Sequence, residues 1–298
     1  MPPGRIRAPA SGLRRRMNAT EFQHRIRTEG RYETPARGRL RLPSWLATPF
    51  GYLGMAQVYL SGNLDARFHR DFEQNYFAKF GMMPFRMMES FGTQIRYCGF
   101  ERVREMDMPV VWVANHMSPL ETYILPPALL AFSPLAIVLK ESLVRYPVFG
   151  RVVRSIHTIR LGRKNAMADL RTTLEQGEQL LKEGRSVLVF PEGSRSRTFY
   201  PEAFNSIGVK LAQRAKVPVV PVALRTDAMQ IGRKMKDLFI IHPERPVRIE
   251  CCPPVLPGAD PRAALAELRD FISGRLAEWQ TEYDSGVPLL PPPSSQKP

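Results

Sequence analysis

The chain has 298 residues, 44% of them hydrophobic, so it is long enough and apolar enough for one large domain with appendages. Its three cysteines, two of them adjacent, exclude a disulfide framework and fit no metal-binding spacing, which favours a reducing compartment. The net charge of +15 favours a polyanionic partner, either nucleic acid or an anionic membrane surface.

The basic charge is concentrated at the start of the chain. Residues 1–41 contain eleven arginines, no lysine and three glutamates, a net charge of +8. No long apolar run follows the arginines of the first 20 residues, so this is no secretory signal. We expect a basic, disordered arm over residues 1–41. A solvated tail, a polyanion-binding arm and an organellar transit peptide remain open, as does a start at Met17.

An uncharged stretch, residues 42–64, follows the arm. It is long enough to span a bilayer, but prolines, glycines and a glutamine dilute it. Trp45, Tyr52 and Tyr59 suit the headgroup level of a membrane. We therefore predict an N-terminal membrane-associating helical segment over residues 42–95, lying at the interface. A spanning helix and a helix packed on the domain are the alternatives. The four methionines between residues 82 and 88 suit an acyl-chain groove or ordinary core packing.

From residue 96 to residue 257, strand and helix signals alternate. Apolar runs predict buried strands, and apolar residues at helical spacing predict helices between them. This alternation indicates an α/β fold, a layered sheet flanked by helices. The strands include residues 109–116, 134–140 and 186–193, and the helices residues 165–184 and 204–215. Residues 258–284 contain a C-terminal helix from Pro261 to Tyr283, and residues 285–298 are a proline-rich tail.

Two segments at predicted strand ends carry residues suited to chemistry. In "NHMSPLET", His116 lies five residues before Glu121, a spacing that suits a base and its orienting carboxylate but that His24 and Glu29 also show. In "FPEGSRSR", Arg195 lies in a turn after an apolar strand, where its planar fork could bind a phosphate group. No clustered set of His, Asp and Glu has metal-ligand spacing, and no Gly-x-Ser-x-Gly elbow appears.

Four ordered segments, "VANHMSPLE", "KESLVRYPVFG…TIRLGR", "FPEGSRSR" and "VPVVPVAL", resemble the motifs of the glycerolipid acyltransferase family, of the lysophosphatidic-acid (1-acyl-sn-glycerol-3-phosphate) type. The resemblance covers about residues 99–254 and implies a glycerol-3-phosphate-acyltransferase-like fold, with residues 96–257 as the acyltransferase domain. The chain departs from the family pattern at Glu121, where aspartate is usual, and at His157, Arg160 and Ser194.

The resemblance also implies roles for individual residues. His116 would be the general base, and Glu121 the carboxylate that orients it. The residues assigned to the acceptor's phosphate are Arg163, Glu192, Gly193 and Arg195, and those in supporting positions are Asn115, Ser194, Pro218 and Pro221. No metal or cofactor is implied.

The activity implied is acyl transfer from an acyl thioester, carried by coenzyme A or by acyl carrier protein, to the free hydroxyl of a lysophospholipid. The first candidate acceptor is 1-acyl-glycerol-3-phosphate, which would give phosphatidic acid. Another lyso-lipid acceptor, or a catalytically weakened lipid-binding protein on the same fold, is the alternative. The expected partners are the two substrates, an anionic membrane surface and acyl carrier protein if it is the donor, with no nucleic acid. The expected location is the cytoplasmic face of a membrane, peripheral or monotopic.

Overall fold

An eight-stranded sheet organises the chain, in the order β1-β2-β10-β7-β3-β6-β4-β5. The computed structural model describes residues 17–35, 41–146, 149–232, 235, 237–258 and 260–284. Strands β7, β3, β6, β4 and β5 are parallel, while β10 and β2 run the opposite way. The strands are β1 (Tyr32–Glu33), β2 (Ile95–Cys98), β3 (Val111–Ala114), β4 (Leu135–Lys140), β5 (Thr158–Leu161), β6 (Ser186–Val189), β7 (Val219–Arg225) and β10 (Val247–Cys251), with a separate hairpin of β8 (Met229–Ile231) and β9 (Phe239–Ile241).

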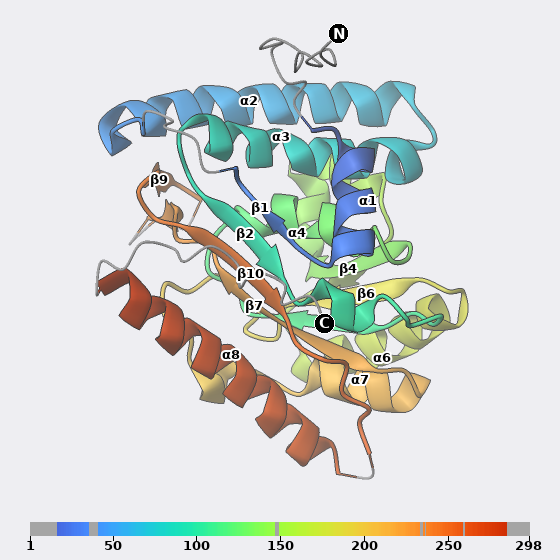
Figure 1. Ribbon diagram of the computed structural model, residues 1–298. Helices are drawn as coiled ribbons and strands as arrows, with labels where there is room; N and C mark the ends of the chain where they lie inside the picture. Colours follow the sequence, from blue (N-terminus) through green and yellow to red (C-terminus); the bar gives the residue numbers. More distant parts are fainter. Residues whose placement is uncertain are drawn as a thin grey trace, which may run out of the picture.

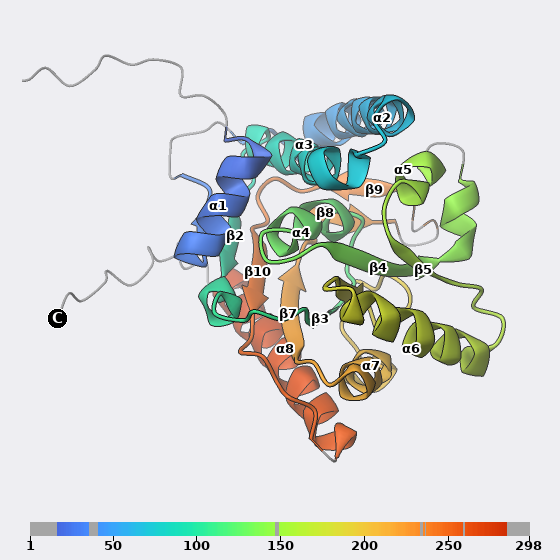
Figure 2. The same ribbon diagram turned by 90° about the vertical axis from the view of Figure 1, so that its right-hand side faces the viewer.

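Helices cover both faces of the sheet (Figures 1 and 2). On one face, α1, α3 and α4 pack over the larger hydrophobic core, and α2 lies outside α3. On the other face, α6, α7 and α8 cover the second core. The helices are α1 (Ala19–Glu29), α2 (Ser44–Phe68), α3 (Phe77–Ser90), α4 (Glu121–Leu129), α5 (Gly150–Arg154), α6 (Ala166–Lys182), α7 (Ile207–Ala215) and α8 (Pro261–Asp284).

The central strands are mostly apolar because helices cover both their faces. Every residue of β3, β6 and β7 is buried, the pattern of parallel strands inside an α/β layer. The predicted α/β sheet flanked by helices is therefore confirmed. The strand predicted over residues 186–193 ends earlier, at Val189, because the chain turns there and the Gly193 N–H donates to the Phe190 carbonyl. The helix predicted over residues 204–215 begins only at Ile207.

The prediction of a disordered arm over residues 1–41 is wrong for residues 19–29, which form α1. Phe22 and Ile26 of this helix are fully buried in the larger core. Asn18 and Glu21 form a reciprocal capping box at its start, and Gly30 ends it in the left-handed conformation. Burial of two large side chains outweighs the effect of the surrounding arginines. Residues 1–16 and 36–40 of the predicted arm lie outside the described residues.

Residues 42–95 contain two helices, α2 and α3, joined through a π-helical turn at Phe72–Tyr76. The inner side of α2 is buried on α3 and the hairpin, at Ala47, Gly51, Met55, Val58 and Gly62. No helix in the described part of the chain is long and apolar enough to cross a bilayer. The methionine-rich stretch lies on α3, where Met82 and Met88 are buried in the core.

The last helix, α8, packs against β7 on the face opposite α4. Asp260 accepts a hydrogen bond from the Arg262 N–H at 2.8 Å, as a residue before a helix start does. The predicted tail, residues 285–298, lies outside the described residues.

Candidate active site

The candidate site lies at one edge of the sheet, where three neighbouring parallel strands end. Strand β3 lies between β6 and β7, so the segments that follow these strands meet at the same edge. Asn115 and His116 follow β3, the segment Phe190–Arg197 follows β6, and Thr226 follows β7.

Asn115 fixes the start of the segment that carries His116 to the sheet. Its side chain is fully buried and hydrogen-bonds to the backbone of β7, as a neighbouring strand would. The amide Nδ2 donates to the Leu224 carbonyl at 2.9 Å, and Oδ1 accepts from the Leu224 N–H at 2.7 Å. Two hydrogen bonds from one side chain to the N–H and the carbonyl of Leu224 hold the chain at the residue before His116. The supporting position predicted for Asn115 is thus a backbone clamp.

His116 and Glu121 are in contact, as their spacing predicts for a base and its orienting carboxylate. The distance from His116 Nδ1 to Glu121 Oε1 is 2.9 Å. The imidazole stacks on the Phe190 ring, with centroids 4.4 Å apart, and its side chain is 15% exposed. Glu121 is the first residue of α4 and is fully buried.

The Glu121 carboxylate accepts hydrogen bonds from several groups besides His116. Oε1 accepts from the N–H groups of Met117 at 2.6 Å and Ser118 at 2.8 Å. Oε2 accepts from the Ser118 hydroxyl at 2.8 Å and from the Thr226 hydroxyl. Burial raises the pKa of Glu121, but the hydrogen bonds and the nearby imidazole outweigh burial and hold that pKa below its usual value. Glu121 is therefore an anion at neutral pH.

An ionised carboxylate only accepts hydrogen bonds, so the proton in this pair belongs to His116 Nδ1. In the neutral imidazole this assignment leaves Nε2 as the unprotonated nitrogen. Within the described residues, Nε2 has no hydrogen-bond partner. The arrangement therefore presents a proton acceptor, oriented from behind by a buried anion.

The Phe190–Arg197 segment holds the backbone of His116. Glu192 Oε1 accepts from the His116 N–H at 2.6 Å, and the Ser196 N–H donates to the His116 carbonyl at 2.8 Å. Gly193 has φ of 68°, a backbone conformation that residues with a Cβ rarely adopt. The conformation, rather than lack of space, favours glycine there, because no atom lies within 4 Å of where a Cβ would be. The Glu192 carboxylate thus binds the catalytic backbone, which differs from the phosphate contact expected for it.

Burial and the nearby Glu121 charge raise the pKa of Glu192 to about 7, although the His116 N–H opposes them. Near neutral pH this carboxyl is therefore partly protonated. The protonated form still accepts the His116 N–H through its carbonyl oxygen.

Arg195 lies at the same edge, and its side chain is 22% exposed. Its Nη2 is 2.7 Å from Asp237 Oδ1, in the loop between β8 and β9. Its charge also acts on the hydroxyls of Tyr59 on α2 and Tyr123 on α4, which are 2.7 Å apart. Arg195 is thus a half-buried cation between the catalytic edge and α2, placed to bind an anionic group.

The other predicted site residues are not brought to His116 by recorded contacts. Arg163 is exposed, and its N–H donates to Asp169 at the start of α6, so the structure does not bring it to the predicted phosphate site. Ser194 is exposed, while Pro221 is buried in β7 opposite Val113. His157, a departure from the family's second motif, lies with Nδ1 2.7 Å from a carboxylate oxygen of Glu73. The same carboxylate also binds Arg185.

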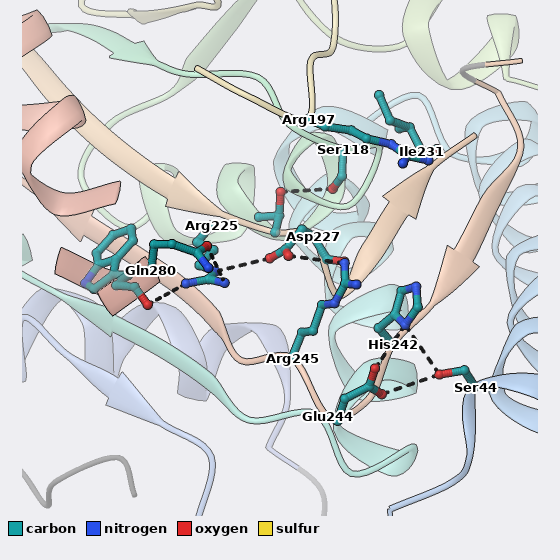
Figure 3. Close-up of polar contacts among 12 residues, drawn as sticks. Ser44, Ser118, Arg197, Arg225, Asp227, Ile231, His242, Glu244, Arg245 and Gln280 are labelled. Atoms are coloured by element: carbon teal, nitrogen blue, oxygen red, sulfur yellow. Dashed lines mark hydrogen bonds and ion pairs between the residues drawn. The ribbon is translucent and has the colours of Figure 1, made fainter. Parts of the chain in front are cut away.

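A cavity of about 320 Å³ opens beside the catalytic segment, between the end of β7 and α8. Met117, Arg197, Phe199, Asp227 and Leu276 are among its lining residues. Arg197 donates two hydrogen bonds to the Ile231 carbonyl, so its guanidinium ties the third motif to the β8–β9 hairpin (Figure 3). Within the described residues, no group of three or more His, Cys, Asp or Glu is placed to hold a metal ion.

Comparisons with known proteins show which family the chain resembles. Residues 94–225 match the family model described as Acyltransferase, a range that contains every predicted site residue. This stretch of the chain is therefore similar to the Acyltransferase family. The family resemblance drawn from the four motifs is confirmed.

Two curated relatives are both named 1-acyl-sn-glycerol-3-phosphate acyltransferase. The one from Pseudomonas aeruginosa is 30% identical over 170 residues, 57% of this chain and 63% of the relative. The one from Limnanthes douglasii is 27% identical over 167 residues, 55% of this chain and 56% of the relative. The chain thus matches less than two thirds of the length of each.

A solved structure supports the fold. The crystal structure of the 1-acyl-sn-glycerophosphate acyltransferase PlsC from Thermotoga maritima superposes with a TM-score of 0.55. The match covers 80% of this chain and 96% of the PlsC chain. The two chains are 21% identical, so this similarity concerns the fold alone.

Glu192 should make the protein less stable as the pH rises. Its folded-state pKa of about 7 lies above the ordinary value, 4.5, so the folded chain binds more protons than the unfolded chain between these values. Stability is therefore lost as the pH rises from about 4.5 to about 7. In Glu192→Gln this loss, up to about 3 kcal/mol, should disappear. Urea unfolding at pH 5 and pH 8 measures it, with Glu183→Gln on the surface as the control; identical pH dependence in both variants and the wild type would refute the assignment.

Proposed function

We propose that this protein transfers an acyl group from an acyl thioester to the free hydroxyl of a lysophospholipid, first of all 1-acyl-glycerol-3-phosphate. The observation that carries the proposal is His116, with Nδ1 bound at 2.9 Å to a buried, ionised Glu121 and Nε2 without a partner among the described residues. The printed names of the curated relatives support the same acceptor.

The reaction needs a base because an alcohol has a pKa far above 7. As the acceptor hydroxyl attacks the thioester carbonyl, its proton passes to His116 Nε2, and the Glu121 charge stabilises the imidazolium. The tetrahedral intermediate then collapses, the C–S bond breaks, and the imidazolium returns the proton to the leaving thiolate. The products are an ester and a free thiol, and no acyl-enzyme forms. Coenzyme A and acyl carrier protein are both candidate carriers of the thiol.

Arg195 is the group we assign to the acceptor's phosphate. Its present partner, Asp237, is 78% exposed, and an exposed ion pair contributes little stability. A phosphate monoester carries more charge and can accept two parallel hydrogen bonds from one guanidinium. Exchange of Asp237 for the substrate phosphate would place the acceptor at the edge where His116 lies.

The contact between His116 and Glu121 also bears on the alternative of a weakened, non-catalytic protein. That alternative rests on glutamate replacing the family's usual aspartate. The longer side chain still reaches Nδ1 at hydrogen-bond distance and remains ionised. The His116–Glu121 contact is therefore kept despite the replacement, and acyl transfer is the function we favour. Other lyso-lipids are the competing acceptors.

The outer surface of α2 supports a location on a membrane. Large apolar side chains along this helix are 39–74% exposed, which is unusual for a surface in contact with water. Because the inner side of α2 is buried on the domain, the helix is apolar on both sides. The exposed residues are Trp45, Phe50, Tyr52, Leu53, Leu60, Leu64 and Phe68. We propose that α2 lies flat on the bilayer by this surface, on its cytoplasmic side.

A basic hollow next to this surface supports an anionic membrane as the partner. Its volume is about 290 Å³, and Leu60 and Leu64 of α2 line it together with three arginines, Arg67, Arg151 and Arg154. Among the described residues, no carboxylate pairs with these arginines. Three uncompensated cations beside exposed leucines suit phosphate headgroups whose acyl chains cover the helix.

His116→Ala should lower kcat at least about 100-fold, the low end for loss of a general base, while the chain stays folded. The measurement is mass-spectrometric detection of phosphatidic acid from 1-acyl-glycerol-3-phosphate, with each acyl carrier in turn. His24→Ala, which changes an exposed histidine on α1, is the matched control. Near-normal turnover by His116→Ala would remove the proposed mechanism, and absence of turnover by the wild type with every lyso-lipid tested would remove the function.

Arg195→Lys should raise the KM for a phosphate-bearing acceptor about tenfold, since lysine is a point charge that cannot bind two phosphate oxygens in parallel. The KM for the acyl donor should change little, which serves as an internal control. Arg171→Lys on the exposed side of α6 is the matched control. An unchanged acceptor KM would exclude Arg195 from the phosphate site.

Replacing Arg67 and Arg151 by glutamine should weaken binding to anionic vesicles by about fivefold per arginine, because each contributes about 1 kcal/mol near such a surface. Binding to phosphatidylcholine vesicles should not change. Lys210→Gln with Arg262→Gln, on helices of the opposite face, makes the same charge change as a control. Vesicle pelleting at several salt concentrations measures the effect; a wild type that binds neutral and anionic vesicles equally would refute the proposal.

A further inference from the structure

The hydrogen bonds to Glu121 differ in where their donors come from. His116, Met117 and Ser118 lie within five residues of Glu121 and belong to the same turn. The Thr226 hydroxyl comes from a position 105 residues away, directly after β7. Thr226 is fully buried, and its Oγ1 is also 2.9 Å from the Ser118 hydroxyl. One distant residue therefore ties the catalytic turn to the sheet.

The position of Thr226 is fixed by its two charged neighbours in the sequence, Arg225 and Asp227, whose contacts with Gln280 and Arg245 are drawn in Figure 3. Arg225 donates to the Trp279 carbonyl at 2.5 Å and to Gln280 Oε1 at 3.2 Å, both on α8. Asp227 pairs with Arg225 and with Arg245, each at 3.3 Å. The backbone around Thr226 is thus held between α8 and the segment before β10.

The distribution of donors on the carboxylate shows what Thr226 contributes. Oε1 faces His116 and the two backbone N–H groups, whereas Oε2 faces the two hydroxyls. A hydroxyl has one proton, so Ser118 can donate either to Glu121 or to Thr226 at a given moment. Thr226 is then needed to keep Oε2 satisfied, and with it the orientation of the whole carboxylate. An unsatisfied oxygen of a buried anion would favour rotation away from His116.

The presence of glutamate at this position gives Thr226 its specific role. Glutamate has one more rotatable bond than the aspartate usual in the family, and therefore more conformations to restrict. The local turn fixes Oε1, and the hydroxyl after β7 fixes Oε2. We propose that Thr226 is a positioning residue for acyl transfer, which holds the Glu121 carboxylate in the orientation that keeps His116 Nε2 directed at the acceptor hydroxyl. This inference rests on the proposed function.

The test compares Thr226→Val, which keeps the shape and removes the hydroxyl, with Thr226→Ser, which restores it. Thr226→Val should lower kcat about tenfold, the loss expected for one hydrogen bond to a charged group, with little change in either KM. Thr226→Ser should recover activity to within about twofold. Should Thr226→Val fail to fold, as judged by circular dichroism, Thr226→Ala takes its place. A wild-type kcat in the variant without the hydroxyl, or no recovery with serine, overturns the inference.

A double-mutant cycle separates positioning from general destabilisation. If Thr226 acts through the Glu121 carboxylate, Thr226→Val should cost less than about twofold once Glu121→Gln has removed the charge. A purely structural role predicts the same tenfold loss in both backgrounds, and that result overturns the inference.

The hydrogen bond between His116 and Glu121 gives a readout that does not depend on activity. Without the Thr226 donor, the carboxylate is free to rotate away from His116, which weakens the bond from Nδ1–H to Oε1. In Thr226→Val, the NMR resonance of the His116 Nδ1 proton should move upfield, and this proton should exchange with water faster than in the wild type. An unchanged Nδ1 proton resonance overturns the inference even when the wild type proves inactive, an outcome that would otherwise count only against the proposed function.

Discussion

A fully buried carboxylate, Glu121, is the constraint on which the site depends. Removing an anion from water costs several kcal/mol unless hydrogen bonds and opposite charge compensate it. Here the compensation comes from two backbone N–H groups, two hydroxyls and the imidazole that the carboxylate orients. The groups that stabilise the anion are therefore the same groups that shape the catalytic turn. Any change that frees one of them alters both the stability of the turn and the position of the base.

The topology of the sheet makes this arrangement possible. Strand β3 lies between two parallel strands, β7 and β6, so the segment after it has a neighbour on each side. On the β7 side, Asn115 binds the Leu224 peptide and Thr226 binds Glu121. On the β6 side, Glu192 and Ser196 bind the two ends of the His116 peptide. His116 is thus held from both flanks by the segments that follow two fully buried strands.

The sequence predicted what depends on local pattern and on motifs. The buried strands are visible as apolar runs, and the pair His116 and Glu121 is visible once the other three motifs support it. The prediction of a disordered arm failed at residues 19–29 because it weighed the many arginines and overlooked two apolar residues, Phe22 and Ile26, that are buried. The sequence "NATE", residues 18–21, is a capping-box signal that marks the start of this helix. The roles of Glu192 and Thr226 depend on contacts across 76 and 105 residues, which no local pattern encodes. The phosphate-binding role predicted for Arg163 depended on a motif alone, and in the structure its backbone N–H donates to Asp169.

Two tyrosines of the surface helix α2, Tyr59 and Tyr52, contact elements that carry residues of the site. On its inner side, the Tyr59 hydroxyl binds that of Tyr123 on α4, the helix that begins with Glu121. Nearer its start, the Tyr52 ring stacks on Phe239 and its hydroxyl binds the Phe239 backbone, at the beginning of β9. The loop before β9 carries Asp237, the partner of Arg195. These contacts link α2 both to the helix that begins with Glu121 and to the loop that pairs with Arg195.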